Sequence, residues 1–390
     1  MKSRPRIYAA SIDDILGGLV TDVYFERTRR IVEAAGLGDV RVRMEVHAYS
    51  LPKGYEWAVF AGLEEALAIL EGKPVDVYAL PEGTIFYRKE PVMVIEGRYA
   101  DFAVYETPVL GALRFASSIA TKAARIRAAA GDRLVLYFGL RALHPAVAPA
   151  ADRAAYIGGL DGVSGLASKQ YLGVEPRGTM PHALIIVFGD QREAWRWYSR
   201  LYGETIALVD TFYDERVESL MAAETLGEKL VGVRLDTPSS RRGKMRDIVE
   251  EVRWVLEMTG RGDVKVIVSG GVDEEQILQL RDIVDGFGVG TAISAAPSVD
   301  LSMDIVEVNK GDGWEPVSKR GKLPGLKQLY RCPDGSRVVA RWHQEPPCPG
   351  GEPMLVKYLD SGKLVRDLPG LEEIREYVLS QLRGLGLLGG

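Results

Sequence analysis

Five short apolar segments, each followed by a helix-like segment, constrain the fold of this 390-residue chain more than any other feature. The apolar segments are continuous rather than alternating, which is typical of parallel strands that are buried on both faces. The segments between them carry apolar residues at spacings of three and four and therefore predict helices. This alternation predicts an α/β domain with a parallel sheet, but the pattern alone does not separate an open sheet from a closed barrel. The predicted strands are LVLYFGLR, TIALVDTF, LVGVRLD, VKVIVSGG and DGFGVGTAI.

The flanking segments differ in texture from this central part. The N-terminal segment combines a predicted helix, EWAVFAGLEEALAIL, with strand-like runs rich in Val, Tyr and Ile, and this mixture predicts an α+β module. The tail contains two strand-like runs, a Pro/Gly-rich patch EPPCPGGEP and a closing helix, LEEIREYVLSQLRGLG, which together predict a small appended module. The predicted domains are therefore 1–110, 111–302 and 303–390.

Charge and composition exclude several classes of protein. The 49 basic and 54 acidic side chains leave a net charge of −5, which provides no general field for nucleic acid or an anionic membrane. No apolar run reaches the roughly 18–20 residues of a membrane helix, and Asp13 and Asp14 interrupt any signal peptide. The two cysteines, Cys332 and Cys348, exclude a disulfide framework and favour a reducing cytoplasm. The single asparagine, Asn309, indicates a thermophilic source.

Polar residues or glycines close all five predicted strands. A lone charged residue after a strand is usually only part of a solvated loop, but five consecutive occurrences weaken that interpretation. Because ligands gather at the carboxyl ends of parallel strands, we expect these residues to share one site. They are Arg141, Asp210 with Thr211, Arg234 with Asp236, Ser269 with Gly270 and Gly271, and Gly288 with Gly290.

Two glycine turns and a basic loop predict phosphate binding. The turns in VSGGVDEE and FGVGTAIS permit close backbone approach, and N–H groups at the following helix starts can hold a phosphate, although glycine also closes turns for packing reasons. In RLDTPSSRRGK, Arg234 suits an oxyanion and Asp236 suits ribose hydroxyls or hydrated Mg²⁺. An ordinary solvated basic loop is the alternative. Further candidates in this loop are Ser239, Ser240, Arg241, Arg242 and Lys244.

The four histidines do not identify a catalytic residue by chemistry alone. His182 in RGTMPHALII and His144 in RALHPAV can titrate near neutrality in a polar cleft. His47 lies in a predicted strand, where a packing role is more common, and His343 lies in the tail. The tail cysteines are isolated and form no CxxC pair, so no structural zinc is expected.

The motifs together resemble one family. In chain order, TDVYFERT, LPEGTIF, YFGLRALHP, GGLDGVSG, RGTMPHAL, LVDTFYDE, RLDTPSSRRG, VSGGVDEE and FGVGTAIS are similar to archaeal nicotinate phosphoribosyltransferases of the type II phosphoribosyltransferase fold. The resemblance covers almost the whole chain. It implies an open β-sandwich domain, an irregular TIM-like α/β barrel, and active sites completed across the interface of a homodimer or a higher homo-oligomer.

The resemblance also implies an activity in NAD salvage. Nicotinic acid and 5-phosphoribosyl 1-diphosphate would give nicotinate mononucleotide and pyrophosphate, with Mg²⁺ accompanying the diphosphate and ATP. ATP hydrolysis would be coupled through transient phosphorylation of His182 in the GT-x-x-H motif, which includes Thr179. Tyr24 of a neighbouring subunit would stack on the pyridine ring.

The remaining implied roles concern the two substrates. Arg141 would meet the carboxylate of nicotinic acid, Arg234 and Asp236 the phosphoribosyl group, and the four glycines the 5′-phosphate; Asp210 and Thr211 complete the expected substrate-binding set. Nicotinamide or quinolinate as the pyridine substrate, and a barrel that binds phosphorylated ligands without turnover, are the alternatives. Archaeal relatives often carry a cysteine cluster in the tail that this chain lacks, so apolar and proline packing is expected there instead.

Overall fold

The chain, seen in a computed structural model that describes residues 6–238, 240, 243–342 and 344–389, divides into two units by packing. The first unit comprises Met1–Thr121 and Pro297–Val378, and the second comprises Lys122–Ala296 and Leu379–Gly390. Two of the three points of division fall inside helices, α5 (Glu106–Ala130) and α14 (Leu371–Gly384), and the third lies between Ala296 and Pro297. These points differ from the domain limits 1–110, 111–302 and 303–390 taken from the sequence. Those limits remain a prediction.

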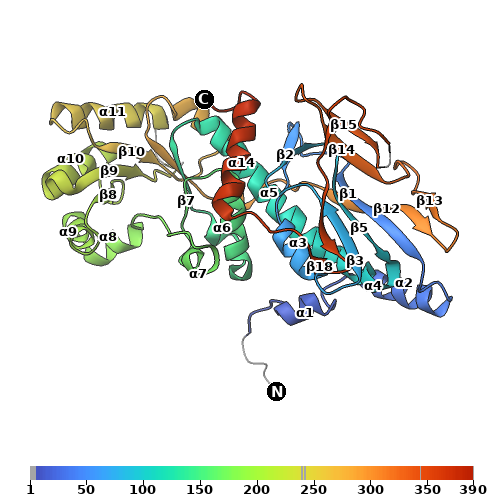
Figure 1. Cartoon of the computed structure of the whole chain (residues 1–390). Coiled ribbons are helices and arrows are strands. Elements are labelled where there is room, and N and C mark those ends of the chain that lie inside the picture. Colours follow the sequence, from blue (N-terminus) through green and yellow to red (C-terminus); the bar gives the residue numbers. More distant parts are fainter. Residues whose placement is uncertain (1–5, 239, 241–242, 343, 390) are drawn as a thin grey trace, which may run out of the picture. The chain divides into compact units, whose positions relative to one another are not determined.

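The second unit is built on a parallel sheet (Figure 1). Its strand order is β7-β6-β11-β10-β9-β8, and the pairs of neighbouring strands are parallel. All five predicted strands are present, and the mixed α/β fold class with a barrel-type parallel sheet is confirmed. The sixth strand, β7, escaped prediction because it is only two residues long. The bounds are β6 (Leu134–Tyr137), β7 (Gly162–Val163), β8 (Thr205–Leu208), β9 (Leu230–Leu235), β10 (Lys265–Val268) and β11 (Gly286–Val289).

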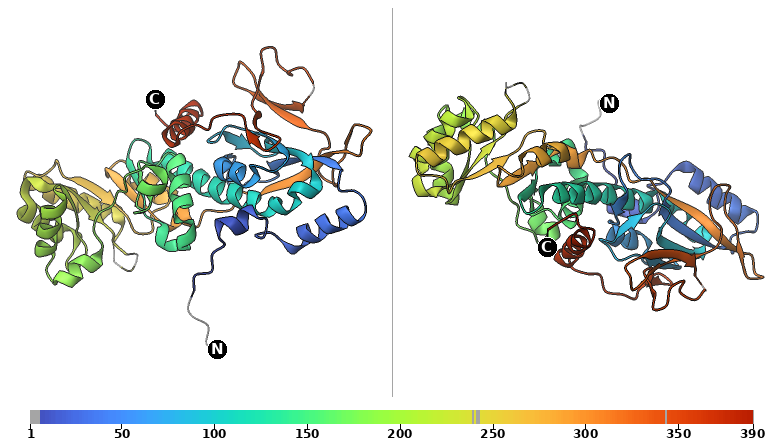
Figure 2. Two further views of the ribbon diagram at one scale, coloured as in Figure 1. Left: turned by 60° about the horizontal axis from the view of Figure 1, so that its bottom comes forward. Right: turned by 90° about the horizontal axis from the view of Figure 1, so that it is seen from above.

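Helices connect these parallel strands, as the apolar spacing predicts. Helices α10 and α11 lie side by side (Figures 1 and 2). Asp214 caps α10 by accepting the N–H of Val217, and Asp273 caps α12 by accepting that of Gln276. The helices are α6 (Ala148–Ile157), α7 (Ser168–Leu172), α8 (His182–Phe188), α9 (Gln191–Tyr202), α10 (Glu215–Leu226), α11 (Met245–Met258), α12 (Glu274–Leu280) and α13 (Thr291–Ser294), with short 3₁₀ turns η2 (Leu140–Ala142), η3 (Pro145–Val147) and η4 (Gly227–Lys229).

The first unit contains a seven-stranded antiparallel sheet that joins segments far apart in the sequence. Strand β12 pairs with β1, and β17 pairs with β3, so strands of the predicted tail module belong to this sheet rather than standing apart. The sheet order is β13 (Trp314–Pro316), β12 (Leu301–Asn309), β1 (Arg41–Ala48), β5 (Pro91–Arg98), β3 (Val75–Ala79), β17 (Val356–Asp360) and β18 (Lys363–Leu364). A three-stranded sheet accompanies it, with β15 (Arg337–Arg341), β14 (Lys327–Arg331) and β16 (Glu352–Pro353).

The helix predicted over EWAVFAGLEEALAIL is shorter than expected. Its first residues form strand β2 (Trp57–Val59), which pairs with β4 (Ile85–Tyr87), and helix α3 covers only Leu63–Leu70. Gly62 separates the two elements with a φ of +90°, and a Cβ atom there would lie 2.7 Å from a backbone carbonyl oxygen of α5. Glycine is therefore required at this junction. The other helices are α1 (Ile12–Leu16), α2 (Val23–Ala34), α4 (Tyr99–Phe102) and the 3₁₀ turn η1 (Ala103–Tyr105).

The two cysteines form a disulfide, which corrects the expectation that apolar and proline packing alone hold the tail. Pairing of β14 with β16 aligns Arg331 with Glu352, and this register brings the loop that carries Cys348 next to Cys332. Two isolated cysteines in a sequence do not reveal this pairing.

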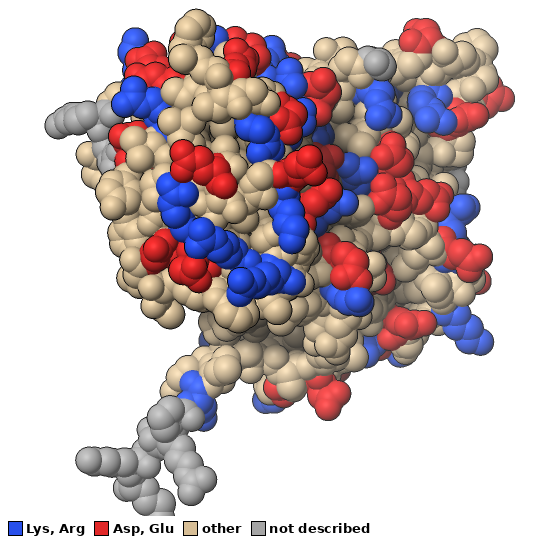
Figure 3. All heavy atoms as spheres, turned by 90° about the vertical axis from the view of Figure 1, so that its left-hand side faces the viewer, with Lys and Arg blue, Asp and Glu red and all other residues tan. Residues whose placement is uncertain are grey.

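The surface agrees with the mixed charge of the sequence. Figure 3 shows acidic and basic side chains interspersed over one face of the molecule. Within the described ranges, no helix has both the length and the apolar character needed to cross a membrane.

Candidate active site

A cavity of about 700 Å³ opens at the carboxyl ends of β6, β9, β10 and β11. The residues that line it belong to the second unit, and most of them lie at strand ends, as the sequence predicts for ligand-binding groups, whereas residues 178–183 lie in the segment that leads into α8 and in its first turn. Phe138 and Ser164, which the sequence argument did not select, also contribute to the wall. The predicted residues in the lining are Arg141, Thr179, His182, Arg234, Asp236, Ser269, Gly270, Gly271, Gly288 and Gly290.

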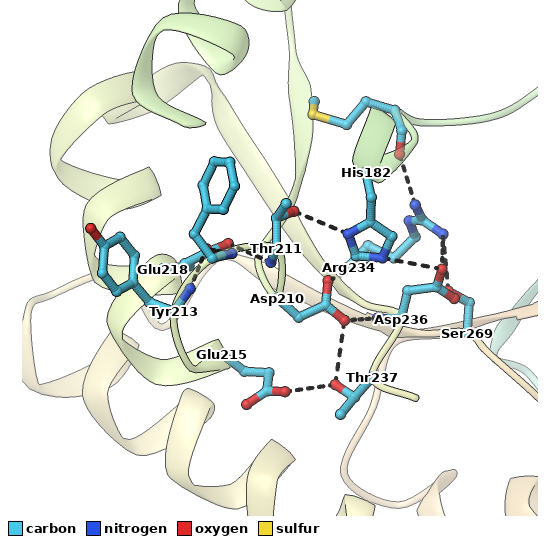
Figure 4. A network of polar contacts seen from close by, with 12 residues as sticks. His182, Asp210, Thr211, Tyr213, Glu215, Glu218, Arg234, Asp236, Thr237 and Ser269 are labelled. Atoms are coloured by element: carbon cyan, nitrogen blue, oxygen red, sulfur yellow. Dashed lines mark hydrogen bonds and ion pairs between the residues drawn. The ribbon is translucent and has the colours of Figure 1, made fainter. Parts of the chain in front are cut away.

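Arg234, Asp236 and Ser269 form a connected polar group on the floor of this cavity (Figure 4). Nη1 of Arg234 donates to Oγ of Ser269 at 3.0 Å, and that hydroxyl donates to Oδ1 of Asp236 at 2.7 Å. Nη2 of Arg234 donates to the carbonyl oxygen of Met180 at 2.7 Å. Burial lowers the pKa of Arg234, while Asp236 acts in the opposite direction. Arg234 thus holds the GT-x-x-H segment against the end of β10.

The imidazole of His182, the first residue of α8, lies between two loops (Figure 4). Its Nδ1 is 3.0 Å from the hydroxyl oxygen of Thr211. Its Nε2 is 3.7 Å from Oδ1 of Asp210 and 3.7 Å from Oδ2 of Asp236. About a third of the His182 side chain is exposed. The ring is therefore fixed on one nitrogen by a hydroxyl and faces two carboxylates with the other.

Asp210 is the most deeply buried carboxyl group of this cluster, with 1% of its side chain exposed. Its Oδ2 accepts the backbone N–H of Asp236 at 2.7 Å and lies 3.4 Å from the hydroxyl oxygen of Thr237. In the part of the chain that the structure describes, its Oδ1 has no hydrogen-bond partner. Burial raises the pKa of Asp210 to about 6, and the nearby His182 limits this rise.

Two carboxylates of α10 bind the loops that follow β8 and β9, and neither was predicted from the sequence. Glu218 is fully buried and accepts the backbone N–H groups of residues 211–213. Glu215 is also buried and accepts the hydroxyl proton of Thr237 at 2.9 Å. The only sequence signal was the presence of two acidic residues in the first turn of a helix, which normally indicates a favourable interaction with the helix dipole.

The predicted glycine turns adopt conformations that explain their composition. Gly270 and Gly271 have φ values of +85° and +75°, a region in which other residues are strained. A Cβ atom on Gly288 would lie 2.5 Å from the ring of Phe138, and one on Gly290 would lie 3.2 Å from the Phe138 carbonyl oxygen. These glycines therefore let the ends of β6, β10 and β11 approach closely around the cavity.

The other predicted residues are distributed more widely. Arg141 is exposed on η2 at the rim of the cavity. Tyr24 is exposed on α2 in the first unit, in ring contact with Phe25 at 4.3 Å between centroids.

His144 caps η3 by accepting the N–H of Ala146. His47 is buried in β1, where Nδ1 lies 3.3 Å from a Glu45 carboxylate oxygen and Nε2 lies 3.1 Å from Nζ of Lys322, so its surroundings are polar rather than apolar. Ser240 and Lys244 are exposed and absent from the cavity lining, while Ser239, Arg241, Arg242 and His343 lie outside the described residues.

The carboxylates of the site suit Mg²⁺ in part. The carboxylate of Asp236, which lines the cavity, is a hard oxygen donor of the kind that Mg²⁺ prefers, whereas the buried Oδ1 of Asp210 faces Nε2 of His182 and does not line the cavity. Over the described ranges, no group of three or more His, Cys, Asp or Glu side chains is arranged to hold a metal ion. The donor set therefore fits an ion that one or two carboxylates share with the oxygens of a phosphate ligand.

Family models match most of the chain. The quinolinate phosphoribosyl transferase N-terminal domain matches residues 22–117, and the C-terminal domain of the same family matches residues 119–304. The chain is 31% identical to nicotinate phosphoribosyltransferase pncB2 of Mycobacterium tuberculosis, over 95% of this chain and 83% of that protein. It is 28% identical to nicotinate phosphoribosyltransferase of Bacillus subtilis, over 82% of this chain and 74% of that protein.

Solved structures extend the similarity to the whole fold. A nicotinate-nucleotide pyrophosphorylase from Pyrococcus furiosus is 51% identical, with a TM-score of 0.94 over 98% of this chain and 99% of that one. Human nicotinic acid phosphoribosyltransferase is 23% identical, with a TM-score of 0.78 over 95% and 94%, which shows a shared fold. The similarity thus covers both units.

Proposed function

The chain belongs to the nicotinate phosphoribosyltransferase family, and from that membership we propose that it forms nicotinate mononucleotide and pyrophosphate from nicotinic acid and 5-phosphoribosyl 1-diphosphate. The observation that carries the proposal is that the Arg234–Asp236 pair and two glycine turns line the same cavity. Such a cavity combines groups for a phosphorylated sugar with groups for its departing diphosphate. The product would enter NAD salvage.

The proposed reaction needs positioning more than a strong protein nucleophile. The pyridine nitrogen attacks C1 of the ribose, the bond from C1 to the diphosphate oxygen breaks, and positive charge develops on the ribose. Asp236, whose carboxylate is held by Ser269 and lies 3.7 Å from Arg234, can orient the ribose hydroxyls and stabilise this charge. Mg²⁺, bound with the diphosphate, would supply charge neutralisation for the leaving group.

Both substrates have candidate partners in the cavity wall. The glycine turns after β10 and at the end of β11 would surround the 5′-phosphate, with the Ser269 hydroxyl nearby. The ring of Phe138 offers an aromatic surface for the pyridine, and Arg141 at the rim offers a guanidinium for its carboxylate. Tyr24 would reach the pyridine from a neighbouring subunit of a homo-oligomer, which we place in the cytoplasm.

A pyrophosphate-release assay tests this proposal directly. The protein is incubated with 5-phosphoribosyl 1-diphosphate, Mg²⁺ and one of nicotinic acid, nicotinamide or quinolinic acid, the last because the matching family model carries the name of quinolinate. Nicotinic acid should give the fastest release. Faster release with either other pyridine would replace the proposed substrate, and no release with any of the three would favour a barrel that only binds phosphorylated ligands.

We also propose that ATP hydrolysis is coupled to this reaction through His182. The position of its imidazole in the cavity wall, fixed by Thr211 and facing Asp210 and Asp236, supports this role. His182→Ala should abolish acid-labile labelling from γ-labelled ATP and remove the stimulation by ATP, while basal nucleotide formation survives because Arg234 and Asp236 remain. If the wild type carries no label, and the variant changes only the melting temperature, the coupling role is wrong while the transferase activity stands.

A further inference from the structure

We propose that Glu218, which lies outside the cavity, is a positioning residue that sets the orientation of the His182 imidazole through the loop of residues 211–213. The inference rests on the proposed function, because it concerns the histidine to which that function assigns energy coupling. The two residues are not in contact, and the path between them consists of hydrogen bonds (Figure 4).

The first step of the path is a carboxylate with three backbone donors. Oε1 of Glu218 accepts the N–H groups of Phe212 and Tyr213 at 2.7 and 2.9 Å, and Oε2 accepts that of Thr211 at 3.1 Å. The Glu218 side chain is fully buried. Three donors on one buried carboxylate fix the backbone of three consecutive residues, because each lost bond would leave a polar group without its partner.

The second step connects this loop to the imidazole. Thr211 is one of the three fixed residues, and its hydroxyl oxygen lies 3.0 Å from Nδ1 of His182. The Thr211 hydroxyl can donate to Nδ1 or accept from it, so this contact fixes the orientation of the ring whichever nitrogen carries the proton. The position of the Thr211 hydroxyl therefore determines how Nε2 is placed against the carboxylates of Asp210 and Asp236.

The position of Glu218 in α10 supports this role over simple helix capping. Asp214 already caps the helix by accepting the N–H of Val217 at 3.0 Å. Glu218 lies one turn further along, and its side chain bonds to the loop before the helix instead of to the helix itself. A carboxylate in this place interacts with the strand-end loop that carries Thr211, and that loop is where the proposed chemistry needs precision.

The test uses the full-length protein and a measurement that does not require turnover. Histidines labelled with ¹⁵N give two-bond ¹H–¹⁵N spectra that report which ring nitrogen is protonated, and the chain has only four histidines. The His182→Ala spectrum identifies the His182 signals. We compare wild type with Glu218→Gln, Thr211→Val and the double variant, and with Thr211→Ser, which keeps the hydroxyl. Glu224→Gln is the matched control, because Glu224 lies on the same helix but is exposed and paired with Arg192.

We expect Glu218→Gln and Thr211→Val to shift the His182 nitrogen signals in the same direction, and Thr211→Ser and Glu224→Gln to leave them unchanged. The stimulation by ATP should fall about 10- to 100-fold in the first two variants, the scale for a misplaced reacting group. In the double variant the loss should not exceed that of either single change by more than about twofold, because both act on one contact.

Unchanged His182 signals in a folded Glu218→Gln protein, or losses that multiply in the double variant, would overturn the inference. If Glu218→Gln does not fold, Glu218→Asp takes its place, since it keeps the charge but shortens the reach, and the same criterion applies to its spectrum. Shifted signals in a protein without phosphoribosyl transfer would refute the proposed function and leave the positioning role intact.

Discussion

Asp210→Asn should make the protein more stable at pH 8 and no more stable at pH 4. Burial raises the pKa of Asp210 to about 6 from the 3.8 of a free side chain, so the folded state holds this proton more tightly than the unfolded state. The free energy of unfolding therefore falls as the pH rises from about 4 to 6, and the full cost of the ionised carboxylate is present above pH 6. A difference of about two units between the pKa values of the folded and unfolded states corresponds to about 3 kcal/mol of unfolding free energy.

The substitution removes this cost and leaves the geometry of the loop in place. The amide oxygen of asparagine can still accept the N–H of Asp236, which lies 2.7 Å from the carboxylate in the native protein. The pKa of about 6 already includes the stabilisation of the ionised carboxylate by His182, so we expect a gain of up to about 3 kcal/mol at pH 8. Turnover should fall, because the charge next to Nε2 of His182 is lost.

Urea unfolding followed by circular dichroism at pH 4, 6 and 8 measures this effect. The difference in unfolding free energy between variant and wild type should be near zero at pH 4 and should grow through pH 6. Repeating the series in a His182→Ala background removes the contribution of the histidine and leaves that of Asp210. A difference that does not depend on pH, or a variant that is less stable than wild type at pH 8, would refute the burial argument.

Three further substitutions test the cavity wall. Asp236→Asn should keep the fold and lose at least about 10²-fold in turnover, measured by pyrophosphate release, because a part-exposed carboxylate stabilises the fold little and orients substrate strongly. Arg141→Ala should weaken nicotinic acid about 10- to 150-fold more than nicotinamide, measured by the ratio of their kcat/KM values, and equal losses would place Arg141 elsewhere. Gly288→Ala should lower the unfolding free energy by about 1–3 kcal/mol and raise the KM for nicotinic acid, because the new methyl group displaces the Phe138 ring; unchanged kinetics would argue against a role for that ring.

Much of the site was predictable because parallel strands impose a simple rule on position. Arg234, Asp236 and Ser269 each follow an apolar segment, and the carboxyl ends of adjacent parallel strands must lie at one edge of the sheet. The spacing in RLD also placed Arg234 and Asp236 on the same side, and they lie 3.7 Å apart. No distant contact had to be known for these inferences.

Other parts of the fold depended on contacts that the sequence does not display. The tail segment around β17 joins the sheet of the first unit by pairing with β3, although nearly 280 residues separate the two strands. The disulfide follows from the pairing of β14 with β16. The helix pattern before Gly62 was misleading because WAV suits a strand as well as a helix, and the pairing of β2 with β4 decides between them.

Glu218 could not be predicted from its position after a strand, because it lies in a helix. An acidic residue in the first turn of a helix is common, and its ordinary explanation is a favourable interaction with the helix dipole. Glu218 lies in the first turn of α10 and is fully buried beneath the loop of Thr211, whereas Glu224 lies near the end of the same helix and is exposed beside Arg192. The difference arises because the loop folds back over the start of α10 and places three N–H groups within reach of one carboxylate. Residues that support a site from outside the cavity are therefore identified by their burial and by the N–H groups that they accept. Both are properties of the folded chain rather than of a motif.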